Sequence, residues 1–402
     1  MGLTGKKLYC RSFQAAMKLG NYAIKYPTPE VLEGPGQVDR LGAFLKEKNL
    51  NDILIVTGEG MRRRGQVQPL LDGLEENGIR YVLQCYTTPD PTSDDVEAGY
   101  ETYRTQDCKA IVALGGGSRI DCAKAIAAKA VHPKKTVAQL QGVLKVHRRV
   151  PTLIAIPTTA GAGSETTVAA VITDSATHRK AAINDPFLVP KYAVLDPTLT
   201  LTLSPYMTAI TGLDAMAHAV EAYTNHTYNT GWEDHMAKMA VLLIYRNLLT
   251  VCNDGTDLKA RQNMQLAALY AGRAFTRGCV GYVHALGHAL GGLYGVPHGL
   301  AMAVLLPEVL DAYGEAVYKP LAVLAELCDM PGISDKDMTS SFIHWIRSVN
   351  EDMNLTLPAG TIREEDIDKI ITWADREANP LYPVPVIWGR EEFRRVIERV
   401  RG

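Results

Sequence analysis

The feature that most constrains the fold is an alternation of short apolar runs with helical segments in the first half of the chain. Runs such as residues 53–57, 81–86 and 110–114 are rich in β-branched and aliphatic residues, which is typical of strands buried on both faces of a sheet. Helical periodicity separates these runs, so we expect parallel strands with helices on both faces. Further strands are expected at residues 153–156, 169–173 and 193–195.

The pattern changes after Asp196 and Pro197, where helical periodicity takes over and continues to the end of the chain. A chain of 402 residues is long enough for two cores. We therefore predict an α/β domain over residues 1–197, with a parallel sheet and flanking helices, and an all-α domain over residues 198–402. Residues 26–32 are expected to form an edge strand because they contain two prolines. Residues 1–22 have the pattern of an amphipathic helix, and the sequence leaves open whether it docks on this chain or on a second subunit.

Composition excludes several classes of function. The net charge of −2 gives no general attraction to nucleic acid or to an anionic membrane. The seven cysteines are scattered without a CxxC pair, so we expect free thiols and a cytoplasmic location. No apolar run approaches membrane-spanning length.

Two pairs of metal-ligating residue types stand at helical spacing in the second half: Asp214 with His218, and His284 with His288. Residues four apart share one face of a helix, so each pair can address a common point. His298 follows a proline that favours a helix start and can turn towards the first pair. A lone histidine is more often an ordinary core or surface residue, but burying several such groups together is costly unless a ligand satisfies them. The pattern predicts a divalent-cation site without naming the metal.

A glycine loop follows the strand at residues 110–114 and consists of Gly115, Gly116, Gly117 and Ser118. Glycines let the backbone approach a ligand closely, and the free amides of a helix N-terminus favour a phosphate. Ser118 is the expected N-cap, with Asp121 three residues later as the acid of a capping box. A tight turn with an ordinary capped helix is the alternative, since the loop is neither GxGxxG nor a P-loop.

A second loop, residues 156–166, is small, rich in hydroxyl groups and contains two glycines. It follows a predicted strand, and ligands of open α/β sheets bind at the carboxyl ends of strands. A plain connecting loop is the alternative.

Four segments in this order resemble the iron-dependent (group III) alcohol dehydrogenase family: residues 115–124, 157–165, 212–223 and 281–299. The resemblance implies a dinucleotide-binding α/β domain followed by an all-helical metal domain. It also implies transfer of a hydride between NAD(P)H and a small aldehyde or alcohol.

The resemblance further assigns metal ligands and an active-site histidine. Asp214, His218, His284 and His298 match the family's ligands, and iron is the expected metal, although zinc or manganese suits the same donors. His288 matches an additional histidine near cofactor and substrate, which can relay a proton to solvent.

The cofactor assignments follow from the two loops and from two positions at which this chain differs from most members of the family. Thr158, Thr159 and Lys180 match positions that contact the cofactor. Most relatives carry an aspartate where this chain has Gly58 and a proline where it has Arg119. A glycine leaves space for a 2′-phosphate, with three arginines close by at residues 62–64, whereas Glu59 could replace the missing aspartate. We therefore expect use of NADP(H) as well as NAD(H).

Arg277 stands where the family usually has asparagine. An arginine beside a cation is unfavourable unless it is solvated, paired or offered an anion. It therefore either pairs with a carboxylate such as Glu221 or turns outward, or else it binds the acidic end of a substrate. The second alternative predicts a semialdehyde, sulfoacetaldehyde or phosphonoacetaldehyde.

Two functions compete with the dehydrogenase: a lyase of the same fold that resembles dehydroquinate synthase, and a non-catalytic dinucleotide sensor. The lyase's lysine and arginine pattern is not evident in this chain. The expected partners are a small aldehyde or alcohol and further copies of the chain in a homodimer or larger homo-oligomer.

Overall fold

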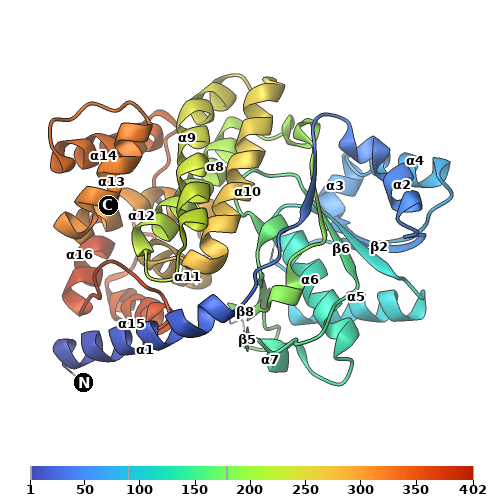
Figure 1. Cartoon of the computed structure of the whole chain (residues 1–402), viewed down its shortest axis with the longest axis horizontal. Helices are drawn as coiled ribbons and strands as arrows, with labels where there is room; N and C mark the ends of the chain where they lie inside the picture. The colour runs from blue at the N-terminus through green and yellow to red at the C-terminus, as the bar shows by residue number, and fades with distance from the viewer. Residues whose placement is uncertain (1, 89, 178–179, 402) are drawn as a thin grey trace. The chain divides into compact units, whose positions relative to one another are not determined.

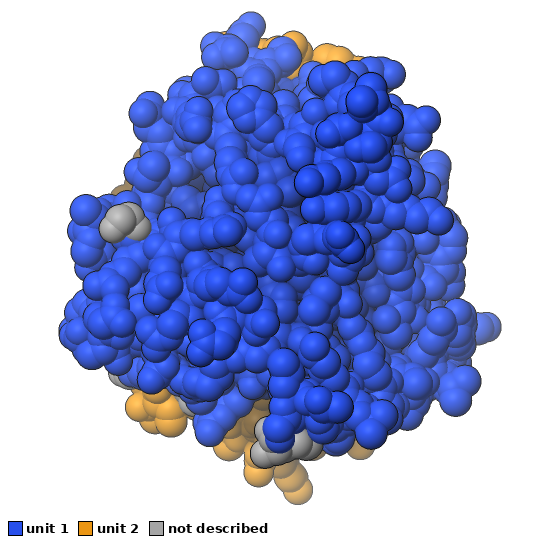
Figure 2. All heavy atoms as spheres, turned by 90° about the vertical axis from the view of Figure 1, so that its left-hand side faces the viewer, with its two compact units in different colours: residues 1–25, 203–255, 266–402 blue, residues 26–202, 256–265 orange. Residues whose placement is uncertain are grey.

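The computed structural model describes residues 2–88, 90–177 and 180–401, which form two compact units (Figures 1 and 2). We call residues 26–202 and 256–265 the sheet unit, and residues 1–25, 203–255 and 266–402 the helical unit. Residues 1–25 therefore group with the helical part of the chain, and the domain boundary at residues 197–198 stays a prediction. Among the helices of the described ranges, none combines the length and apolar character that crossing a membrane requires.

The sheet unit contains a six-stranded parallel sheet, which confirms the predicted fold class. In spatial order its strands are β1 (Glu30–Glu33), β9 (Tyr192–Leu195), β6 (Thr152–Pro157), β4 (Ala110–Gly115), β2 (Asp52–Gly58) and β3 (Arg80–Tyr86). Every residue of β4 is buried, as expected for a central strand whose two faces are both covered.

Helices cover both faces of this sheet, because successive strand residues point to opposite sides. Ile53 and Ile55 pack with α2 (Gln37–Glu47) and α4 (Gln68–Glu76). Leu54 and Val56 pack with α5 (Ser93–Thr105) and α6 (Gly117–Val131). Two shorter helices complete the unit, α3 (Glu59–Arg63) and α7 (Val137–Leu140).

One predicted strand lies elsewhere. Residues 169–173 form β7 (Ala169–Thr173), which pairs antiparallel with β8 (Lys180–Asn184) in a separate three-stranded sheet with β5 (Gly142–Val143). Its side chains alternate between partly exposed and buried, so β7 has one covered face and lacks the double burial of a strand in the central sheet. The predicted edge strand is confirmed as β1, although pairing begins only at Glu30, beyond the two prolines.

The helical unit begins with α1 (Leu3–Ala23), which docks on the C-terminal part of the same unit. The Gln14 amide donates to the carbonyl oxygens of Pro380 and Tyr382 at 3.1 and 2.8 Å, and Lys6 pairs with Asp375. The N-terminal segment is therefore part of this chain's own fold.

The rest of the unit is helical, as predicted. Its helices are α8 (Pro205–Asn225), α9 (Gly231–Asn253), α10 (Leu258–Gly278), α11 (Tyr282–Tyr294), α12 (His298–Tyr313), α13 (Tyr318–Leu327), α14 (Asp335–Asp352), α15 (Ile367–Ala378) and α16 (Arg390–Val400). The first residues of α10, up to Gln265, belong to the sheet unit.

Candidate functional site

Helix α8 carries the first pair of candidate ligands. It begins with Ser204 as N-cap and Pro205 in its first turn, and nearly all of its following residues are buried. Asp214 and His218 lie four residues apart on this helix, and both are buried. The Nδ1 atom of His218 lies 3.8 Å from Oδ1 of Asp214.

Helices α11 and α12 bring two more histidines to the same carboxylate. His284 lies in the first turn of α11, and His298 is the first residue of α12 after Pro297, as the proline predicted. Their Nε2 atoms lie 4.0 and 3.3 Å from Oδ1 of Asp214. The candidate donor atoms of Asp214, His284 and His298 all lie within 4.8 Å of one another.

The donor set fits a divalent cation, because buried polar atoms in it lack hydrogen-bond partners. These atoms are Oδ1 of Asp214, Nδ1 of His218 and Nε2 of His284. Leaving such atoms unsatisfied costs free energy that coordination to a cation would recover. The His218 ring stacks on Phe275 at 4.2 Å between centroids and lies 4.4 Å from the His284 ring. It borders the three-residue group, and its place as the fourth ligand stays a prediction.

The protonation states also suit metal binding. Burial lowers the pKa of His218 to about 3 and holds the pKa of His284 well below its usual value, so both rings are neutral at pH 7. For Asp214, burial acts to raise the pKa, but the imidazoles of His218, His298 and His284 outweigh it and lower the pKa. A carboxylate and neutral imidazoles are the forms in which these side chains bind a metal.

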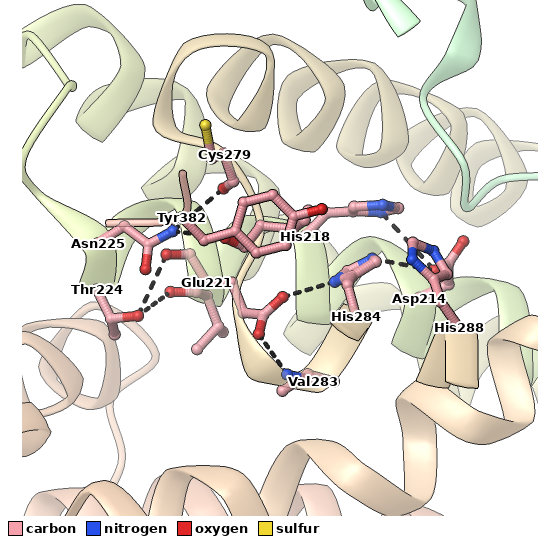
Figure 3. A network of polar contacts seen from close by, with 12 residues as sticks. Asp214, His218, Glu221, Thr224, Asn225, Cys279, Val283, His284, His288 and Tyr382 are labelled. Carbon is pink, nitrogen blue, oxygen red and sulfur yellow. Dashed lines mark hydrogen bonds and ion pairs between the residues drawn. The ribbon is translucent and has the colours of Figure 1, made fainter. Parts of the chain in front are cut away.

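Glu221 extends the face of α8 that carries Asp214 and His218 (Figure 3). Its Oε2 atom lies 2.6 Å from Nδ1 of His284, and its Oε1 atom accepts a hydrogen bond from the Val283 amide at 2.7 Å. Burial raises the pKa of Glu221 to about 7, against the lowering effect of backbone amides in the Gly281–His284 turn. Sequence reasoning missed this contact, although the i, i+4, i+7 spacing of the three residues was available as a signal.

A second histidine–carboxylate pair lies beside the group. Nδ1 of His288 lies 2.7 Å from Oε1 of Glu377 on α15, and the Tyr382 hydroxyl donates to the same oxygen at 3.1 Å. The His288 ring stacks on that of His298 with 5.2 Å between centroids. His288 therefore borders the candidate ligands, and its role near cofactor and substrate stays a prediction. Glu377 had no sequence signal that linked it to this group.

Arg277 is occupied by other groups of the helical unit. Its Nε donates to Glu233 at 2.8 Å and its Nη1 to the carbonyl oxygen of Asn21 at 3.0 Å, in largely buried surroundings. The suggested partner Glu221 was wrong, because that carboxylate binds His284 and the Val283 amide. The pairing favours the structural alternative for Arg277, and its contact with substrate stays a prediction.

The glycine loop lies at the carboxyl end of β4, where α6 begins at Gly117 with Gly116 as N-cap. The predicted cap at Ser118 was wrong, because the helix starts one residue before it and no side chain caps its first turn. The first-turn amides are therefore available to an anion. A Cβ atom on Gly117 would lie 2.7 Å from Cβ of Ala162, so only glycine allows this approach of the two loops.

The second loop follows β6, the neighbour of β4, so the two loops lie side by side. The Thr158 amide donates to the carbonyl oxygen of Gly115 at 3.1 Å. A Cβ atom on Gly116 would contact Oγ1 of Thr159 at 3.5 Å. Asp121, in contrast, is partly buried in α6 and accepts a hydrogen bond from the Val171 amide at 3.0 Å, so the expected capping box is wrong. Burial raises its pKa.

The end of β2 is open at Gly58: among the described residues, a Cβ atom there would have only the Arg119 Nε within 4 Å, at 3.9 Å. The Arg119 guanidinium lies 5.7 Å from the centre of the Tyr86 ring and contacts the Thr88 carbonyl oxygen. It therefore lies at the carboxyl ends of β2 and β3.

The other charged candidates near this strand are paired. Glu59 accepts hydrogen bonds from Arg62 at 2.7 and 2.9 Å and from Arg63 at 3.0 Å, which lower its pKa to about 2. Lys180 opens β8 and donates to Asp90 at 2.7 Å. Cofactor contacts of Gly58, the glycine loop, Asp121, Thr158, Thr159 and Lys180 stay predictions.

Comparison with known proteins identifies the family to which the chain belongs. Residues 27–197 match the family "Iron-containing alcohol dehydrogenase", and residues 208–399 match "Fe-containing alcohol dehydrogenase family, C-terminal". The chain belongs to the iron-containing alcohol dehydrogenase family, which confirms the resemblance found in its sequence.

Individual relatives agree with this assignment. The chain is 37% identical over 326 residues to 1,3-propanediol dehydrogenase of Citrobacter freundii, covering 80% of this chain and 84% of the relative. It is 34% identical over 376 residues to alcohol dehydrogenase 4 of Saccharomyces cerevisiae, covering 93% and 97%.

Solved structures give the same answer. A 1,3-propanediol oxidoreductase superposes with a TM-score of 0.88 at 33% identity, covering 94% of this chain and 99% of that one. A sulfoacetaldehyde reductase of Bifidobacterium kashiwanohense, in complex with NAD+, superposes with a TM-score of 0.83 at 26% identity, covering 94% and 98%. The chain is an oxidoreductase of the alcohol–aldehyde class, and these findings support a metal ion and NAD as its cofactors.

Proposed function

We propose that this protein is a metal-dependent dehydrogenase that interconverts a small aldehyde and its alcohol with NAD(P)H. The observation that carries the proposal is the group of one buried carboxylate and neighbouring imidazoles, in which buried atoms of Asp214, His218 and His284 have no hydrogen-bond partner. Asp214, His218, His284 and His298 would hold one divalent ion. That ion would supply a Lewis acid that polarises the aldehyde carbonyl, and the nicotinamide would supply the hydride.

His288 is the proposed proton carrier. Its Nδ1 faces the Glu377 carboxylate, which accepts a hydrogen bond from that nitrogen and orients the ring. Nε2 is then the ring atom that gives a proton to the product or takes one from the alcohol. Glu377 and His288 are both about one-third exposed, which favours exchange of this proton with solvent.

Iron is the proposed metal, because the chain belongs to an iron-containing family. Three imidazoles and a carboxylate also suit zinc and manganese, and zinc binds such donors more tightly than ferrous iron. Metal-free protein reloaded anaerobically with each ion should regain NAD(P)H oxidation with a small aldehyde, most strongly with ferrous iron. Equal activity of rigorously metal-free protein would overturn the proposal.

For the cofactor, we propose that NADPH is accepted together with NADH. The open position at Gly58 supports this, as does the Arg119 guanidinium next to it, since an arginine at a strand end suits a 2′-phosphate. Arg62 and Arg63 are weaker candidates because both bind Glu59.

Two variants test the cofactor proposal. Gly58→Asp should shift the ratio of kcat/KM values towards NADH by about tenfold, because a carboxylate binds the 2′-hydroxyl and repels a phosphate. Arg119→Met should lower kcat/KM for NADPH more than for NADH. Arg62→Met is the matched control and should leave the ratio unchanged. An unchanged ratio in both Gly58→Asp and Arg119→Met would mean that the ribose binds elsewhere.

The proposed substrate class is a small neutral aldehyde. The 1,3-propanediol dehydrogenase relative supports it, and so does the pairing of Arg277 with Glu233. The sulfoacetaldehyde reductase neighbour keeps an anionic aldehyde as the second candidate. Comparing kcat/KM for propionaldehyde, 3-hydroxypropionaldehyde and sulfoacetaldehyde separates the two. A preference for the sulfonate would overturn the neutral class and require an anion-binding group other than a paired Arg277.

A further inference from the structure

We infer that Glu221 is a positioning residue that fixes the tautomer of His284 and caps the helix that carries it. The inference rests on the proposed metal-dependent function, because it concerns how His284 presents its Nε2 atom to a cation. The comparisons with relatives do not assign this residue.

The geometry around the carboxylate determines which His284 nitrogen carries the proton. Glu221 and His284 are both buried, at 2% exposure each, and Nδ1 lies 2.6 Å from Oε2. A cation held at Nε2 would leave the hydrogen of the ring on Nδ1, and Oε2 of Glu221 lies at the distance to accept a hydrogen bond from it. The lone pair then belongs to Nε2, which lies 4.0 Å from Oδ1 of Asp214 and has no hydrogen-bond partner.

The same carboxylate replaces the missing cap of α11. The N-cap residue is Gly281, which has no side chain to accept the first amides of the helix. Oε1 of Glu221 instead accepts the Val283 amide at 2.7 Å. A Cβ atom on Gly281 would lie 2.7 Å from this oxygen, so glycine is needed for the carboxylate to approach.

Through these contacts, Glu221 affects both the N-terminus of α11 and the orientation of the His284 ring. The start of α11 and the direction of the His284 lone pair are set by one side chain, which itself comes from the helix of Asp214 and His218. A carboxylate behind a ligand histidine commonly contributes about 10–100-fold to metal affinity. We expect that contribution from Glu221.

The test is Glu221→Gln, which keeps the size of the side chain. Its amide oxygen can still accept the Val283 amide, but its NH2 group then faces Nδ1 of His284. The ring must respond by placing its hydrogen on Nε2, which blocks the lone pair needed for coordination. The dissociation constant for Zn²⁺ or Co²⁺, measured by chelator competition, should rise by about 10–100-fold, and the visible spectrum of the Co²⁺ protein should change.

Glu377→Gln is the matched control, because it alters the same kind of pair at His288, which is not a proposed ligand. It should leave the metal dissociation constant within about twofold of wild type. An unchanged constant in Glu221→Gln, or equal losses in the two variants, would overturn the inference. Failure of the wild-type protein to bind any divalent ion would instead overturn the proposed function.

A measurement on the wild-type protein does not depend on a variant that folds. In metal-free protein with 15N-labelled histidine, studied well above pH 7 so that the Glu221 carboxylate is ionised, the His284 signals should show a protonated Nδ1 and an unprotonated Nε2. Assignment of the opposite tautomer would contradict the inference. Gly281→Ala, which pushes the carboxylate away, should weaken Zn²⁺ binding in the same direction as Glu221→Gln.

Discussion

The two units bind their proposed ligands with different kinds of chemical group. In the sheet unit, the loops after β4 and β6 offer backbone amides and small hydroxyl side chains, and glycines allow the loops to pack closely. In the helical unit, the candidate ligands are a buried carboxylate and imidazoles, some of whose donor atoms have no partner. A backbone loop is complete without its ligand, whereas buried ionisable side chains need a cation to balance them. Loss of a candidate metal ligand should therefore weaken ligand binding without destabilising the metal-free protein, whereas a substitution that separates the two loops should weaken both stability and ligand binding.

The largest expected effect is that of Asp214→Ala. Loss of the carboxylate that faces His298 and His284 should abolish tight metal binding and reduce kcat/KM by roughly 10³-fold or more, because a Lewis acid supplies several kcal/mol. The metal-free variant should be close in stability to metal-free wild type, since Oδ1 of Asp214 has no hydrogen-bond partner to lose. Metal content, aldehyde reduction and chemical unfolding measure the three effects. Strong destabilisation of the metal-free variant would show that the carboxylate stabilises the fold by itself.

Arg277→Ala tests whether a paired charge of the helical unit is structural. Removal of one partner from a largely buried ion pair should lower the free energy of unfolding by about 3–5 kcal/mol, since Glu233 is left uncompensated. Urea unfolding measures this change. The ratio of kcat/KM for sulfoacetaldehyde and propionaldehyde should stay the same. A selective loss with sulfoacetaldehyde would restore Arg277 as an anion-binding residue.

The smallest expected effect is in the sheet unit, with Gly117→Ala. The added methyl group would lie 2.7 Å from Cβ of Ala162, so the two loops must separate, at a cost of about 1–3 kcal/mol in stability. The KM for the nucleotide should rise by about tenfold while metal affinity stays unchanged. Gly116→Ala is the matched control for stability, because its Cβ atom would make ordinary contacts at 3.5 and 3.6 Å. Equal loss of stability in both variants would mean that loop packing is not the cause.

Much of the fold could be predicted from patterns formed by residues close together in the sequence. The fully apolar run of β4 indicated a central parallel strand, and the glycines after it indicated a loop that approaches another segment. The strand β7 was also predicted with its observed bounds, but a short apolar run does not reveal which sheet it joins. The prediction of Ser118 as N-cap was wrong. Serine is a good capping residue, but α6 starts one position before it and its first turn has no side-chain cap.

The sequence by itself predicted a sheet-forming first half and a helical second half, and it grouped Asp214, His284 and His298, because residue type, i, i+4 spacing and a proline before a helix are local properties. Tertiary structure decided which carboxylate each basic side chain contacts. Glu221 binds a histidine 63 residues away, Glu377 one 89 residues away, and Glu233 an arginine 44 residues away. The sequence offers several carboxylates that each of these basic side chains could contact. The number of residues between two side chains does not indicate which of them will meet. Burial decides which pairs form, because a buried charged side chain must pair with a group that the packed helices bring within hydrogen-bond distance.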